Sequence, residues 1–188
     1  MENVEKSRED KLKSYVTMLL IAALVFVVDQ ITKYWIRTHL VLRETIKPIP
    51  AIGSWFRIIH WKNTGIAFGL FQGNGWILTV IGLLVVIGII IYSRQVINGP
   101  AYWRVALGLE LGGALGNLAD RLNPELGYVV DFIWIGDFPV FNLADSAIVI
   151  GAIVLIIGMW RQESGSKTDR SDSEKDVNLD GNNEEKHE

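Results

Sequence analysis

Two aspartates in apolar surroundings are the residues best suited to chemistry. Asp131 lies within the stretch VVDFI, where a carboxyl group is poorly solvated and its pKa rises. Asp145 opens an apolar segment in the stretch FNLADSAIVIG. Two carboxyl groups that meet can share one proton, because like charges at close range do not both ionise readily. One carboxylate then activates a water molecule, and the other group protonates the carbonyl oxygen or the leaving group.

Each aspartate also has a purely structural interpretation. Asp131 could be a single exposed acid on a surface strand. Asn142 and Asp145 stand three residues apart at the start of an apolar helix, a spacing typical of a capping box, and Asp145 there complements the helix dipole. Spacing alone leaves the structural and the chemical interpretations open.

Residue types needed for other hydrolytic sites are missing or isolated. The chain has no cysteine, so it has no disulfide, thiol nucleophile or cysteine-ligated metal. Its three histidines form no HExxH pair, and no GxSxG elbow, P-loop or GxGxxG stretch is present. A serine–lysine arrangement with Lys33 lacks a serine placed by a motif. The sequence therefore predicts neither a metal nor another cofactor.

Four apolar stretches must position these groups. Each approaches the roughly 20 residues that a helix needs to cross a membrane. No small-x-small cleavage motif follows the first stretch, so we interpret it as a retained span rather than a signal peptide. The predicted fold is a membrane all-α, four-transmembrane-helix bundle with spans near Tyr15–Ile36, Trp76–Tyr92, Ala101–Ala119 and Leu143–Trp160.

Four spans place both termini on one side of the membrane. Nine Lys and Arg residues flank the spans on the side of the termini and six on the other side, which favours cytoplasmic termini. Asp131 and Asp145 then lie near the extracytoplasmic face. The same face receives the outer segments near 38–75 and 122–140.

The outer segments are expected to contain strands. The stretch SWFRIIHWKN alternates in part and is rich in aromatic and β-branched residues, and Tyr128–Ile135 has the same character. These two strands can form a small extracytoplasmic β-sheet element on the membrane surface. Its expected interfacial anchors are Trp55, Phe56, Trp61, Phe68 and Phe71.

The chain divides into three parts around this bundle. Residues 1–14 form a cytoplasmic N-terminal segment, and residues 15–160 form the membrane domain. Residues 161–188 carry five Lys and Arg against nine Asp and Glu, and this polar tail is predicted to be disordered because it has little apolar surface to bury. Neither the membrane domain nor the tail has a basic patch, which argues against nucleic acid as a partner.

Several further polar residues lie in or beside the spans, where ionisable groups are costly. Asp29 and Lys33 share one helix face and can form a structural ion pair. Glu110, deep in the third span, is best read as a group that locks helices together. The third span ends in GGALGNLADR, where glycines permit close helix approach and Asn117 and Arg121 share a face. For these two residues packing and function are equally supported.

Five stretches together resemble the family of lipoprotein signal peptidases, also called signal peptidase II. They occur in the family's order between about Asp29 and Ala152, and they read VVDQITKYW, NTGIAFGLF, GGALGNLADR, VVDF and FPVFNLADSAI. The resemblance implies that Asp131 and Asp145 are catalytic. It implies supporting roles, including close backbone or substrate approach at the small residues, for Asp29, Lys33, Asn63, Gly113, Asn117, Arg121, Asn142 and Ala144. Asp120 matches the motif without being catalytic in the family pattern.

The resemblance also implies a substrate and a location. The substrate would be a prolipoprotein whose lipobox cysteine carries a diacylglyceryl group, cut just before that cysteine by an aspartic endopeptidase. The enzyme would be a multi-pass monomer in the bacterial cell (inner) membrane, in contact with membrane lipids. Asp145 is expected to be the charged base, because a helix N-terminus stabilises negative charge, and Asp131 to carry the shared proton.

Two rival functions remain open from the residues alone. A proton-relay or transporter-type membrane protein would use Asp29, Glu110, Asp131 and Asp145 as a titrating chain, and should place them near the membrane midplane. A structural scaffold would use the outer strands as a docking surface and would need no pair of acids.

Overall fold

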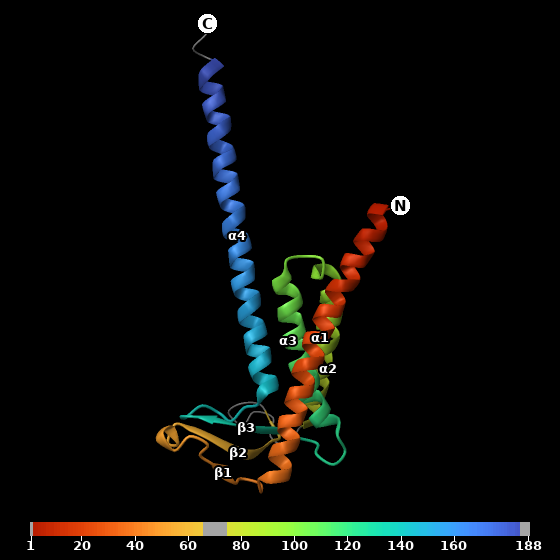
Figure 1. Ribbon diagram of the computed structural model, residues 1–188, viewed down its shortest axis with the longest axis vertical. Helices are drawn as coiled ribbons and strands as arrows, with labels where there is room; N and C mark the ends of the chain where they lie inside the picture. The colour runs from red at the N-terminus through yellow and green to blue at the C-terminus, as the bar shows by residue number, and fades with distance from the viewer. Residues whose placement is uncertain (1, 66–74, 185–188) are drawn as a thin grey trace.

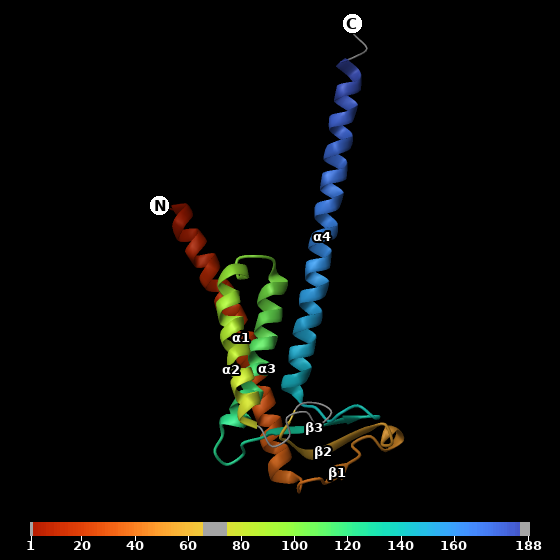
Figure 2. The same ribbon diagram turned by 180° about the vertical axis from the view of Figure 1, so that it is seen from behind.

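The computed structural model describes residues 2–65 and 75–184, which form four long helices and a small sheet (Figure 1). All four predicted apolar stretches lie in helices. Both termini and the connection between the second and third helices lie at one end of the bundle, and the sheet lies at the other (Figures 1 and 2). The helices are α1 (Glu2–His39), α2 (Gly75–Val96), α3 (Ala101–Leu122) and α4 (Leu143–Glu184).

Three of the helices are long and apolar enough to cross a membrane. They are Val4–His39 of α1, the whole of α2 and Leu143–Glu163 of α4. The third helix, α3, has the 22 residues that a span needs, but Glu110 and the polar residues at its end lower its hydropathy. Three of the four predicted spans therefore meet the composition criterion.

The helix α3 lies at the centre of the bundle and contacts α1, α2 and α4. Its glycines make this possible, since a Cβ atom on Gly112 would stand 2.6 Å from the carbonyl oxygen of Ala22 in α1. One apolar core runs between α1, α2 and α3 and contains Met18, Ala22, Val86, Ile89, Leu107, Leu111, Ala114 and Leu118. Thus α3, the helix that ends in polar residues, is enclosed by the other three helices.

The sheet has three antiparallel strands in the order β1 (Thr45–Ile46), β2 (Phe56–Asn63) and β3 (Val129–Ile135). The two predicted strands are confirmed as β2 and β3. The two-residue β1 was not predicted because it is too short to show an alternating pattern. In the register of β2 and β3, Trp61 pairs with Asp131 and Asn63 pairs with Val129. This pairing places Asp131 at the sheet end of the bundle.

The expected interfacial anchors are only partly described. The side chain of Trp55 is 58% exposed and that of Trp61 39% exposed, as an interfacial position requires. Phe56 is half-buried. Phe68 and Phe71 lie outside the described residues.

The helix α4 continues past the apolar stretch and ends at Glu184. An existing helix adds further turns at much lower cost than a new helix pays to nucleate. The division of the chain into a membrane domain and a tail from residue 161 stays a prediction.

Candidate active site

Asp131 is completely buried on β3 and is held by two asparagines. Its Oδ1 accepts a hydrogen bond from Nδ2 of Asn142 at 2.7 Å, and its Oδ2 accepts one from Nδ2 of Asn63 at 2.8 Å. Burial raises the pKa of Asp131 to about 7, and the negative charge of Asp145 adds to the increase against the opposing effect of the two hydrogen bonds. Asp131 is therefore suited to hold a proton near neutral pH.

Asp145 lies in the first turn of α4 and is half-exposed. Its Oδ1 accepts a hydrogen bond of 2.7 Å from Nδ2 of Asn117, and its Oδ2 accepts one of 3.2 Å from the backbone N–H of Asn142. In return, Oδ1 of Asn142 accepts the backbone N–H of Asp145 at 2.9 Å. This reciprocal pair confirms the capping box, and it fixes the carboxylate at a helix N-terminus.

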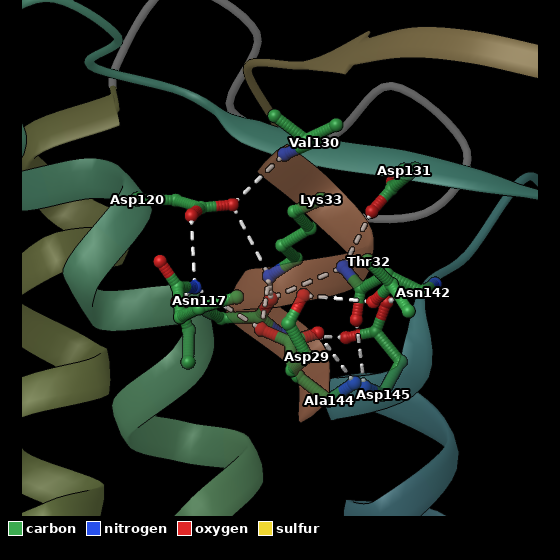
Figure 3. A network of polar contacts seen from close by, with 12 residues as sticks. Asp29, Thr32, Lys33, Asn117, Asp120, Val130, Asp131, Asn142, Ala144 and Asp145 are labelled. Atoms are coloured by element: carbon green, nitrogen blue, oxygen red, sulfur yellow. Dashed lines mark hydrogen bonds and ion pairs between the residues drawn. The ribbon is translucent and has the colours of Figure 1, made fainter. Parts of the chain in front are cut away.

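Asn142 joins the two aspartates. Its side-chain nitrogen donates to Asp131 and also to Oδ1 of Asn117 at 3.1 Å, while its side-chain oxygen caps the turn that carries Asp145 (Figure 3). Asn142 is fully buried, so these contacts are sheltered from water. The structure thus brings both predicted aspartates to one place, from a strand and a helix that are separate in the sequence.

Lys33 is the centre of a second set of polar contacts beside the aspartates. This buried ammonium group lies 2.8 Å from Oδ2 of Asp29 and 3.1 Å from Oδ2 of Asp120, and it donates to Oδ1 of Asn117 at 2.9 Å. The predicted Asp29–Lys33 ion pair is present and gains a second carboxylate. Because Lys33 binds the oxygen of Asn117, the amide nitrogen of that residue is the atom left to face Asp145.

The two carboxylates that contact Lys33 each accept a hydrogen bond from the backbone N–H of the residue that precedes Asp131 or Asp145. Oδ2 of Asp120 accepts the backbone N–H of Val130 at 3.0 Å, and Oδ1 of Asp29 accepts the backbone N–H of Ala144 at 3.0 Å (Figure 3). One buried lysine therefore connects β3 at Asp131 with α4 at Asp145. These contacts fix the strand and the helix relative to α1 and α3.

Gln30 belongs to this set and was missed by sequence reasoning. Its Nε2 donates to Oδ1 of Asp120 at 3.1 Å, to the carbonyl oxygen of Gly116 at 3.1 Å and to Oδ2 of Asp29 at 3.2 Å. The available signal was a polar amide beside Asp29 within an otherwise apolar stretch. Asp120, set aside as non-catalytic, has the structural contacts described above.

The small residues permit the close packing of α3 against α4. A Cβ atom on Gly113 would collide with the carbonyl oxygen of Ala144, and one on Gly116 would stand 3.4 Å from the Cβ of Ala144. Ala144 is itself fully buried. Gly113 and Ala144 thus lie where close backbone approach was expected.

Two further charged residues differ in their relation to the site. Arg121 is half-buried, its Nη1 donates to the carbonyl oxygen of Asn117 at 3.4 Å, and its charge acts on Asp145, Asp131 and Asp120. Glu110 lies deeper in α3, where its Cγ is 2.8 Å from the position of a Cβ on Gly151 of α4. Glu110 is thus packed between helices, and none of its described contacts joins it to the aspartates. Among the described residues, no group of three or more His, Asp or Glu side chains could hold a metal ion.

Comparison with known proteins identifies the family of this chain. The sequence profile of a family described as Signal peptidase (SPase) II matches residues 21–161. The chain belongs to the signal peptidase II family. Among its relatives is a lipoprotein signal peptidase of Moorella thermoacetica, 45% identical over 137 residues that make up 73% of this chain and 88% of that protein. Another, from Pseudomonas aeruginosa, is 37% identical over 158 residues, or 79% of this chain and 90% of that protein.

Solved structures of bacterial membrane enzymes have the same fold. One determined by the in meso method at 2.3 Å resolution superposes with a TM-score of 0.71 and 34% identity, over 79% of this chain and 90% of that one. A second, at 1.9 Å resolution, gives a TM-score of 0.64 and 35% identity over 76% of this chain and 92% of that one. The chain is thus a membrane protein of the signal peptidase II family, and membership covers every residue discussed in the site.

Proposed function

We propose that this protein is an aspartic endopeptidase that removes signal peptides from prolipoproteins in the bacterial membrane. The observation that carries the proposal is the Asn142 side chain, which contacts Asp131 directly and caps the turn that holds Asp145. Two carboxyl groups arranged in this way, one buried and one half-exposed, suit a shared proton and two different roles.

Asp145 is assigned as the general base. Its carboxylate lies at the N-terminus of α4 and takes a proton from water, whose oxygen attacks the scissile carbonyl carbon. Asp131 is assigned as the proton donor to the carbonyl oxygen, because its pKa near 7 leaves it protonated in a large fraction of molecules. As the tetrahedral intermediate collapses, Asp145 returns its proton to the leaving amine and Asp131 recovers one from the hydroxyl group.

The other polar residues are assigned to support this chemistry. Asn63 and Asn142 orient Asp131, and Asn117 orients Asp145. Arg121 brings a positive charge to both aspartates, which would offset charge that develops on the intermediate. Replacement of Arg121 by alanine should slow cleavage, and unchanged turnover would remove it from the mechanism.

The topology supports a substrate that approaches through the membrane. We assign α3 as a fourth span alongside the three apolar helices, with the termini in the cytoplasm and the aspartates near the extracytoplasmic face. A signal peptide is an apolar helix that can lie among the spans, while the diacylglyceryl chains of the modified cysteine stay in the lipid. Cleavage then falls just before that cysteine, at the depth of the sheet, where water is available.

The transporter alternative is not favoured. Its titrating chain should run through the middle of the bundle. Asp29, Asp131 and Asp145 instead gather at the sheet end, while Glu110 is packed separately against Gly151. The scaffold alternative leaves the shared contacts of the two aspartates without a purpose.

The test is cleavage of a purified diacylglyceryl-modified precursor by the wild-type protein and by Asp131→Asn and Asp145→Asn. We expect each variant to accumulate in the membrane and to lose cleavage by a factor of about 1,000 or more. Asp137→Asn is the matched control, because Asp137 is an exposed acid beside the end of the same strand β3. Cleavage by either site variant at the control's rate would refute the aspartic mechanism.

A further inference from the structure

The end of the bundle that carries the termini contains a polar cavity far from the aspartates. Its volume is about 420 Å³, and it opens between the first turns of α1, the connection after α2 and the start of α3. It is lined by Lys6, Ser7, Asp10, Ser14, Asn98 and Arg104. No step of the proposed peptidase reaction uses these residues.

We propose that this polar cavity binds the phosphate-bearing headgroup of an anionic phospholipid. Basic pockets between membrane helices are a common way to bind such headgroups. This lipid site is separate from the proposed peptidase site, so a binding measurement tests it independently of cleavage.

Arg104 is held in place to receive an anion. Its Nη1 donates to Oγ of Ser14 at 3.2 Å and to the carbonyl oxygen of Gly99 at 3.3 Å. Ser14 is buried, so this anchor is part of the helix packing. Among the described residues both bonds use Nη1, which leaves Nη2 available, and a planar guanidinium group matches two phosphate oxygens.

The charges around the cavity favour an anion over a cation. Lys6 and Arg104 contribute two positive charges, against one negative charge from Asp10. The carboxylate of Asp10 already has a cation nearby, since Nζ of Lys13 lies 3.9 Å from its Oδ1. The cavity also offers neutral hydrogen-bond donors to a phosphate ester: the hydroxyl groups of Ser7 and Ser14 and the amide of Asn98.

Aromatic residues at this end indicate the depth of the membrane surface. Trp103, next to Arg104, contacts Tyr92 with ring centroids 5.6 Å apart and Tyr102 at 5.3 Å. Trp160 of α4 is 70% exposed. Tyr and Trp concentrate at the headgroup level, so Arg104 lies where lipid phosphates do. Under the proposed topology this is the cytoplasmic leaflet, which is rich in anionic lipid.

The test is lipid binding to the purified full chain, measured by native mass spectrometry with phosphatidylglycerol and phosphatidylcholine in turn. The wild-type protein should bind phosphatidylglycerol about tenfold more strongly than phosphatidylcholine. Arg104→Gln and Lys6→Gln should each weaken phosphatidylglycerol binding roughly fivefold. Arg94→Gln is the matched control: Arg94 is exposed in the last turn of α2, at the same end, and does not line the cavity.

Each other outcome would overturn the proposal. Equal binding of the two lipids would remove the headgroup preference. Equal losses of phosphatidylglycerol binding in Lys6→Gln and Arg94→Gln would indicate attraction by overall charge alone. Because Lys6 is exposed, its replacement does not disturb the helix packing. Displacement of phosphatidylglycerol by inorganic phosphate at about millimolar concentration would assign the cavity to a soluble phosphate instead.

Discussion

The side-chain nitrogen of Asn142 lies 2.7 Å from Oδ1 of Asp131, and both residues are completely buried. The same asparagine is the N-cap of α4, whose third residue is Asp145. A single amide group therefore has two tasks: it stabilises the start of a helix and it orients a carboxyl group on a strand. The two tasks can be separated by mutation.

Replacement of Asn142 by alanine should remove both tasks, whereas serine should restore one. Serine caps helices well but lacks an amide donor for Asp131. We expect Asn142→Ala to lower the free energy of unfolding by about 1 kcal/mol or more, through loss of the cap, and Asn142→Ser to recover most of that loss. Both variants should cleave the precursor about 100-fold more slowly. Thermal unfolding and cleavage rates measure the two effects, and recovery of turnover in Asn142→Ser would show that the contact with Asp131 is dispensable.

The raised pKa of Asp131 predicts that stability and cleavage activity both decline as the pH rises through 7. Its value is 3.8 in an unperturbed chain and about 7 in the fold, so the folded protein binds this proton more tightly. The resulting stabilisation is complete below about pH 4 and is lost as the pH rises through 7. The free energy of unfolding should fall by at most roughly 4 kcal/mol across this range.

Two measurements check this dependence. Thermal unfolding followed from about pH 4 to pH 8 should give a flatter profile for Asp131→Asn than for the wild-type protein, because asparagine does not titrate. Cleavage by the wild-type protein should decline above about pH 7, as the proton donor is lost. A cleavage rate that keeps rising through pH 8 would contradict the assignment of the proton to Asp131.

Replacement of Lys33 by methionine should destabilise the fold strongly. It leaves Asp29 and Asp120 as buried carboxylates without the ammonium group that both contact, and loss of one partner of a buried pair costs about 3–5 kcal/mol. The triple variant Lys33→Met, Asp29→Asn, Asp120→Asn should recover much of this free energy. The asparagines keep an oxygen for the backbone N–H groups of Ala144 and Val130.

The triple variant separates folding from catalysis. Asn117 would still lack the bond from Lys33, and its oxygen would keep only the bond from Nδ2 of Asn142, so its amide nitrogen would be held less firmly toward Asp145. We therefore expect a folded protein, measured by thermal unfolding, with slow cleavage. Wild-type turnover in the triple variant would mean that Lys33 serves stability alone.

Gly113→Ala tests how closely α3 and α4 must approach. The new methyl group would meet the carbonyl oxygen of Ala144, so the helices must separate at a cost of about 1–3 kcal/mol, and the start of α4 would move with Asp145. Gly88→Ala in α2 is the matched control, because a Cβ there meets nothing within 4 Å. The control should be neutral or slightly stabilising, since alanine favours helix. Equal unfolding temperatures and cleavage rates for the two variants would refute the packing argument.

The sequence by itself determined the elements and the acids. Apolar runs of membrane length predicted four helices, alternation predicted β2 and β3, and the three-residue spacing of Asn142 and Asp145 predicted the capping box. These features are local, because they depend on hydrogen bonds and side-chain periodicity within one segment. The helix α4 extends beyond the predicted span Leu143–Trp160 to Glu184, because extension of an existing helix needs no new nucleus.

Only the tertiary structure decided which polar groups meet. Lys33 contacts Asn117, 84 residues away in the sequence, and Asp29 accepts the N–H of Ala144, 115 residues away. No spacing rule reaches across such distances, since these contacts depend on how α1, α3 and α4 pack. Gln30 was missed for the same reason. A buried polar group must find a partner, but its own sequence neighbourhood does not say which one.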